Sequence, residues 1–277
     1  MRALSIPYPE YQVLTGGIEE ITRPIEYPVI AKRSLDWGGS NIRLINNKAM
    51  LKEYISELGD VKSNPVVLEE YFDSSEITVG GVLKNGRYSP VVEYQTIAKD
   101  NSFELNYLFT NPDLKDHFAK AHAIMARLLE ELNLPTPFLA GNFFVCDSPV
   151  MLEFGPVISH IYSNLLSLFK HQSPLKTVID NLNGQQLSQI PVDGFFGTKI
   201  IYTRNDGQIF QEIKLHRSIK EISGFKGAVC FRDKGFPCDR SGSENIQVAA
   251  VFAVGCDIAH TKTVLDRASE AVTVCKK

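Results

Sequence analysis

The stretch YPVIAKRSLDWGGSNIRLINN (residues 27–47) decides the predicted fold. It opens with a short β-branched run, YPVIAK, that ends on a lysine, and a second apolar run, IRLI, follows the polar loop SLDWGGSN. Apolar runs on either side of a polar, glycine-containing loop are typical of strand, loop and strand. We therefore expect a β-hairpin whose loop contains a Gly-Gly-Ser sequence.

This hairpin carries the first candidate site. Lys32 closes the first strand, and a lysine at a strand end can act as a point charge on phosphate oxygens. Gly38, Gly39 and Ser40 follow, and the backbone N–H groups of such a loop can cover terminal phosphates. Lysines often flank strands and GGS often occurs in loops, so an ordinary surface loop is the alternative.

The second candidate site lies in VVLEEYFDSSEITVGGVLKNG (residues 66–86). The Glu69 carboxylate can accept a hydrogen bond from the exocyclic amine of adenine, and Glu76 can accept hydrogen bonds from ribose hydroxyls. The alternative is a solvated acidic end of a strand.

Further along, the 138–156 stretch predicts a second hairpin. It contains Glu153, a hard oxygen ligand suited to Mg²⁺, although an exposed edge acid is the alternative. We favour a role in metal binding because Glu153 follows the other two candidate sites along the sequence.

The rest of the pattern predicts an α+β fold. The Asn-Gly pair at 85–86 predicts the turn of a hairpin over 76–97, and a polar connection follows it. Period-3.6 spacing predicts helices, and β-branched runs predict short strands after Pro191. The expected helices span 48–58, 113–132, 163–169, 173–182 and 260–272.

Composition narrows the class of protein. The 277 residues are 44% hydrophobic and 22% charged, with a formal net charge of −3. This composition excludes a disordered chain and argues against nucleic-acid binding as its role. Five scattered cysteines without a CxxC pair predict reduced thiols in a cytoplasmic protein. No segment is continuously apolar enough to predict a membrane span. His117 and His122 lie five residues apart on the long helix and are predicted to be surface residues.

Taken together, the segments 6–9, 27–47, 66–86 and 141–156, in this order, resemble the ATP-grasp superfamily. The nearest similarity is to its carbamoyl-phosphate-synthase-like and L-amino-acid-ligase-like members, and the tail between 216 and 272 resembles the small β-rich module of amino-acid ligases. The resemblance implies two α+β lobes that clamp ATP, at 1–72 and 73–188, followed by the β-rich module at 189–277.

The resemblance also implies roles for individual residues. Lys32 would hold the α- and β-phosphates beneath the Gly38, Gly39 and Ser40 loop, Glu76 would bind ribose, and Glu153 would ligate Mg²⁺. The adenine-binding hinge would consist of Glu69, Glu70, Tyr71 and Phe72. The implied reaction activates a small-molecule carboxylate as an acyl phosphate, which an amine then attacks.

Departures from the superfamily pattern open alternatives. Where an acid is usual on the first strand of the metal hairpin, this chain has Asn142 and Phe144, and Glu153 is followed by none of the usual Asn and Arg. Asn142 would offer only a neutral oxygen to the metal, and no catalytic side chain is assigned.

A degenerate scaffold that binds nucleotide weakly or not at all, and that acts as a binding or regulatory subunit, is therefore a rival hypothesis. A split enzyme is another, because the domain that usually precedes Ile6-Pro7 is expected to be missing. Such a chain would need a partner chain or would self-associate.

Overall fold

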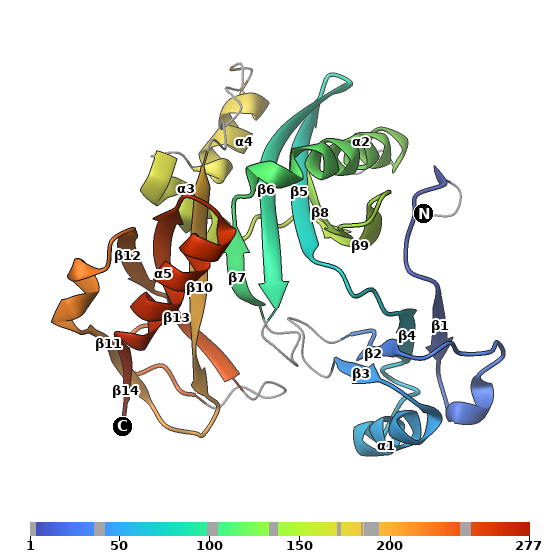
Figure 1. The fold of residues 1–277 in the computed structure, drawn as a ribbon. Coiled ribbons are helices and arrows are strands. Elements are labelled where there is room, and N and C mark those ends of the chain that lie inside the picture. The colour runs from blue at the N-terminus through green and yellow to red at the C-terminus, as the bar shows by residue number, and fades with distance from the viewer. Residues whose placement is uncertain are drawn as a thin grey trace. The chain divides into compact units, whose positions relative to one another are not determined.

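The computed structural model describes residues 4–35, 42–98, 105–132, 138–170, 173–183, 185, 194–238 and 245–277. They form two compact units (Figure 1). The smaller unit contains Tyr8–Ser74, and the larger contains the segment up to Pro7 and the described residues from Ser75 onward. The division into parts at 1–72, 73–188 and 189–277 stays a prediction.

The smaller unit is a four-stranded antiparallel sheet covered by one helix. Its strand order is β1-β4-β2-β3, and Leu51 and Tyr54 of the helix pack on the sheet. The Asn47 side chain caps the helix by accepting a hydrogen bond from the Met50 backbone N–H, which satisfies one of the donors left free at a helix start. The elements are β1 (Tyr11–Leu14), β2 (Val29–Arg33), β3 (Arg43–Ile45), β4 (Val66–Glu70), α1 (Lys48–Leu58) and a 3-10 turn at Ile18–Glu20.

The larger unit is built on an eight-stranded antiparallel sheet with the order β12-β13-β10-β7-β6-β5-β8-β9. The turn between β5 and β6 has positive φ at Asn85 (53°) and Gly86 (70°), as expected for an Asn-Gly hairpin. The strands are β5 (Glu76–Lys84), β6 (Arg87–Ala98), β7 (Leu105–Phe109), β8 (Phe138–Phe144), β9 (Val150–Gly155), β10 (Phe195–Arg204), β12 (Phe225–Cys230) and β13 (Asn245–Gly255).

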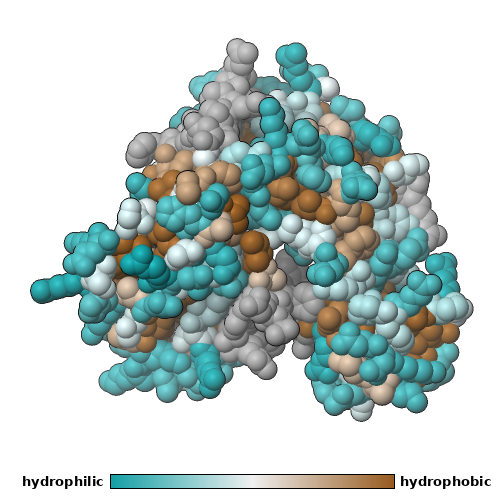
Figure 2. Space-filling view, in the orientation of Figure 1, coloured by the Kyte–Doolittle hydropathy of each residue, from teal (hydrophilic) through white to brown (hydrophobic). Residues whose placement is uncertain are grey.

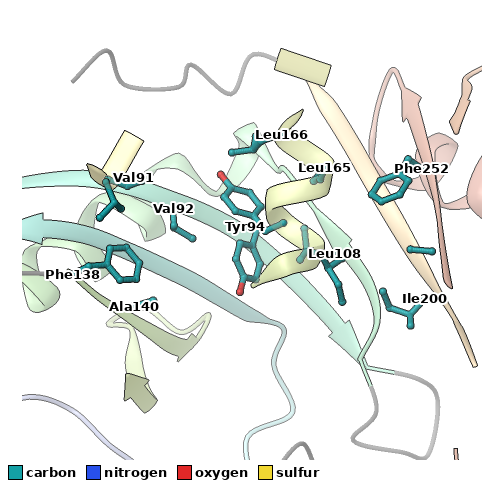
Figure 3. Packing of buried hydrophobic residues seen from close by; sticks show 14 of the residues in the cluster. Val91, Val92, Tyr94, Leu108, Phe138, Ala140, Leu165, Leu166, Ile200 and Phe252 are labelled. Carbon is teal, nitrogen blue, oxygen red and sulfur yellow. The ribbon is translucent and has the colours of Figure 1, made fainter. Parts of the chain in front are cut away.

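Helices cover both faces of this sheet. On one face, α2 (Lys115–Leu132) packs against Ile77 and Val79, and α5 (Ile258–Glu270) packs against the β10 and β13 region. On the other face, α3 (His160–Lys170) and α4 (Pro174–Leu182) cover a cluster that includes Tyr94, Leu165 and Phe252 (Figure 3). Alternate strand residues point to opposite faces, so each strand contributes to both cores.

The structure corrects three expectations. The connection after residue 98 is not wholly polar loop, because Leu105–Phe109 forms β7 inside the sheet. The last helix ends at Glu270, and β14 (Val272–Lys276) follows and pairs with β11 (Phe210–Leu215). His122 is 6% exposed rather than a surface residue. Short 3-10 turns at Pro112–Leu114 and Arg217–Glu221 complete the assignment.

None of the described helices is both long and apolar enough to cross a bilayer. On the face shown in Figure 2, hydrophilic residues are interspersed with smaller hydrophobic patches, which is usual for a folded protein in water.

A close approach between β13 and α5 gives a test of the packing. A Cβ at Gly255 would lie 2.6 Å from the Thr261 backbone nitrogen and 2.5 Å from its Oγ1, and Thr261 is fully buried. We expect Gly255→Ala to lower the free energy of unfolding by about 1–3 kcal/mol because the backbone must move. Gly227→Ala is the control, since its Cβ would meet no atom within 4 Å and should change stability by less than about 0.5 kcal/mol. Denaturant unfolding measures both, and equal effects would contradict this packing.

Candidate functional site

Lys32 and Glu69 form an ion pair in the smaller unit. Their strands, β2 and β4, are neighbours, with Ile30 opposite Glu69, so the two side chains lie diagonally on one face of the sheet. Lys32 Nζ lies 2.8 Å from Glu69 Oε2, and the side chains are only 27% and 16% exposed. The structure thus brings together the residue predicted to bind phosphate and the first residue of the predicted adenine hinge.

The rest of the predicted hinge follows directly along the chain. Glu70 is the last residue of β4. Its Oε2 accepts a hydrogen bond at 3.3 Å from the backbone N–H of Glu10, the residue just before β1. Tyr71 and Phe72 are half-buried and continue towards the larger unit. The predicted phosphate-covering residues Gly38, Gly39 and Ser40 lie outside the described residues.

A polar row crosses four strands of the larger unit. Register places Tyr94 of β6 opposite Thr78 of β5, Thr78 opposite Asn142 of β8, and Asn142 opposite Glu153 of β9. Side chains directly opposite one another in neighbouring strands share a face of the sheet. Glu76, two residues before Thr78, shares that face. The predicted ribose and metal residues of this unit therefore lie on one side of the sheet.

Hydrogen bonds run along this row and fix the Asn142 amide. Thr78 Oγ1 donates to Asn142 Oδ1 at 2.7 Å, and Asn142 Nδ2 donates to Glu153 Oε1 at 2.9 Å. The amide oxygen is used by the threonine, and the amide N–H faces the carboxylate. This orientation gives Glu153 Oε1 a neutral hydrogen-bond donor, and it points the amide oxygen away from the carboxylate.

Tyr94 extends the row into the protein. Burial raises the pKa of the Tyr94 hydroxyl, while hydrogen bonds with Thr78 and Ser159 oppose the shift. The hydroxyl therefore stays protonated and links Thr78 to the segment that leads into α3. Thr78 and Ser159 were not singled out by sequence reasoning, because only the strand register shows that they adjoin Asn142 and Tyr94.

Comparison with known proteins agrees with this architecture. The whole chain superimposes on 70% of the L-amino acid ligase of Bacillus licheniformis, with a TM-score of 0.74 at 11% sequence identity. The chain has the ATP-grasp fold. It also matches the biotin carboxylase domain of the 2-oxoglutarate carboxylase of Hydrogenobacter thermophilus, solved with MgADP, ADP and bicarbonate, with a TM-score of 0.69 at 15% identity over 99% of this chain and 64% of that one.

The chain is also similar to a third solved structure and, over part of its length, to one protein by sequence. The N5-carboxyaminoimidazole ribonucleotide synthetase of Thermus thermophilus has a TM-score of 0.69 at 16% identity, over 98% of this chain and 69% of that one. The carbamoyl-phosphate synthase of Methanobrevibacter smithii is 28% identical over 88 residues, which are 32% of this chain and 23% of that protein. No protein-family model matches the chain.

The donor set in this chain fits one divalent cation better than two. No group of three or more His, Cys, Asp or Glu side chains gathers into a metal site within the described ranges. Glu153 is the one carboxylate in the row, and the Asn142 amide nitrogen donates a hydrogen bond to its Oε1. Mg²⁺ is often held by one or two carboxylates with phosphate oxygens and water, so Glu153 suits a single ion carried by a nucleotide. A Mg²⁺ pair is not supported by these residues.

Replacing the amide by an acid tests this assignment. In Asn142→Asp, two carboxylates would face each other across β8 and β9, so we expect the free energy of unfolding to fall by up to about 1 kcal/mol without cation. Millimolar Mg²⁺ should recover the loss because it binds the folded state. Thermal unfolding with and without MgCl₂ measures this, and Asn142→Ser is the uncharged control. An equal Mg²⁺ response in wild type and all variants would contradict a role of position 142.

Proposed function

We propose that this chain binds ATP and catalyses ATP-dependent ligation of a small-molecule carboxylate to an amine through an acyl phosphate. The observation that carries the proposal is the Lys32–Glu69 pair, because two residue types suited to phosphate and adenine meet on one face of the smaller sheet. Support comes from the ATP-grasp fold and from the shared face of Glu76, Asn142 and Glu153 in the larger unit.

In this proposal each unit carries its own residues suited to nucleotide contacts. The Lys32 ammonium exchanges the Glu69 carboxylate for phosphate oxygens, which releases Glu69 to accept from the adenine amine. The segment 69–72 presents backbone groups to the base edge, and Glu76 accepts from ribose hydroxyls. Bound Mg²⁺, held by Glu153, would reduce the negative charge of the phosphates.

The reaction that follows is balanced without a redox step. A carboxylate oxygen attacks the γ-phosphorus, ADP leaves, and a mixed carboxylic-phosphoric anhydride forms. The amine then attacks the acyl carbon, and phosphate leaves as the amide forms and the amine loses a proton. Because the protein's contribution to phosphoryl transfer is mainly positioning and charge neutralisation, Lys32 is the residue on which the rate depends most.

A second candidate function is a nucleotide-binding ATP-grasp scaffold without turnover. One observation favours it: at the position where a second acid would hold metal, the Asn142 amide instead donates a hydrogen bond to Glu153 Oε1 at 2.9 Å. The scaffold acts alone or beside a partner chain, as in a split enzyme. Ligase and scaffold share the nucleotide contacts and differ in whether ADP is released.

The nucleotide contacts are tested by Lys32→Ala. Loss of a charge-assisted contact costs about 1.5–3 kcal/mol, so the dissociation constant for ATP in the presence of Mg²⁺ should rise about 10–100-fold. Isothermal titration calorimetry measures it. Lys52→Ala, on the exposed side of α1, is the control and should bind as wild type does. Unchanged affinity of Lys32→Ala would refute the assignment.

Turnover is tested separately by ADP release in the presence of pooled amino acids and small carboxylates. The ligase predicts ADP and phosphate formed only when both a carboxylate and an amine are present, and strongly reduced in Glu153→Gln. Nucleotide binding with no ADP release under any pool would favour the scaffold. Failure of ATP to bind at millimolar concentration would overturn both functions.

A further inference from the structure

A charged depression lies in the larger unit, on a part of the chain that the proposed nucleotide contacts do not use. It has a volume of about 420 Å³, within the range of small-molecule sites. One wall is the segment from His216 to Ile222, which follows β11, and the other is the end of α5 with the start of β14. The walls meet where the His216 backbone N–H donates to the Ala271 carbonyl at 2.9 Å.

Charges of both signs line this depression without pairing. Arg267, Glu221 and Glu270 are exposed side chains on its walls, and within the described ranges none of the three makes an ion pair. By contrast, Asp266, next to Arg267 on α5, is paired with Lys199 at 2.8 Å. One concave surface therefore offers a cation and two carboxylates that a ligand can engage separately.

The hydrogen bonds of the His216 ring leave its Nε2–H as a donor. His216 Nδ1 accepts a hydrogen bond from the Ser218 backbone N–H at 3.3 Å and lies 2.7 Å from Ser218 Oγ. A ring nitrogen that accepts carries no proton, so the neutral ring carries its proton on Nε2. Nε2–H is then a donor for an anionic oxygen in the depression that Arg267 also lines.

The two carboxylates of the depression favour a cation. Glu270 is the last residue of α5, and the carbonyl end of a helix carries partial negative charge. Glu221 adds a second carboxylate from the facing wall. The buried Ile222 side chain, 8% exposed, and Ala271 supply apolar surface between the charges.

We propose that this depression binds a free α-amino acid. Arg267 and His216 Nε2–H receive the α-carboxylate, Glu270 and Glu221 receive the α-ammonium, and Ile222 and Ala271 contact the carbon skeleton. A ligand with only one of the two charges leaves the complementary protein charges unsatisfied and binds more weakly. The site is independent of the proposed nucleotide contacts, so it stands or falls by itself.

The test uses the full chain, titrated with single protein amino acids and followed by calorimetry and by ¹H–¹⁵N amide shifts. At least one amino acid should bind at millimolar concentration or tighter and shift the amides of 216–222 and 267–273. Its Nα-acetyl derivative, which lacks the ammonium, and its carboxamide, which lacks the carboxylate, should each bind about tenfold more weakly or worse.

Variants assign the binding to this depression. Arg267→Gln and Glu270→Gln should each weaken binding about tenfold or more and leave ATP affinity unchanged. Arg217→Gln is the matched control, because Arg217 is exposed beside His216 and does not line the depression; it should bind as wild type does. No amide shift with any amino acid, or undiminished binding in Arg267→Gln, overturns the proposal. Equal binding of the acetylated derivative also overturns it, since the site would then recognise only an anion.

Discussion

The register of β5 against β6 and β8 is the constraint on which the candidate site of the larger unit depends. It places Tyr94, Thr78, Asn142 and Glu153 opposite one another on the face that α3 also covers. A slip by one residue would turn the β5 side chains to the α2 face. The register is held by burial, since Ile77 and Val79 on either side of Thr78 are fully buried beneath α2.

The polar row therefore rests on an apolar core. Thr78 and Tyr94 are themselves buried, at 4% and 8% exposure, and buried polar groups cost free energy unless they are hydrogen-bonded. Their bonds to Asn142 and Ser159 meet that requirement, so the row is rigid at its buried end. At its outer end Glu153 is exposed and offers oxygen atoms to solvent. A side chain that binds a ligand must be held in a fixed position by the residues that support it, and the buried end of the row gives the Glu153 carboxylate this support.

Local patterns predicted much of the fold and little of the site. Helix 48–58 and the Asn85-Gly86 turn are confirmed because cap, period and turn signals act over a few residues. The β7 strand was missed because LNYLF is too short to stand out from a polar connection. His122 was misplaced because its burial depends on Tyr88 and Glu93, which approach its two ring nitrogens from the sheet. The Lys32–Glu69 contact likewise needs strand order, which spacing does not give.

The central pairing of the large sheet also sets how the chain can fold. β7 pairs with β10, so its hydrogen-bonding edge stays open until residues 195–204 have left the ribosome. Pairing over such a sequence separation pays loop-closure entropy before any contact forms, which slows folding. An open edge next to apolar residues is also a template for pairing between chains. Fragments that end before β10 should thus aggregate.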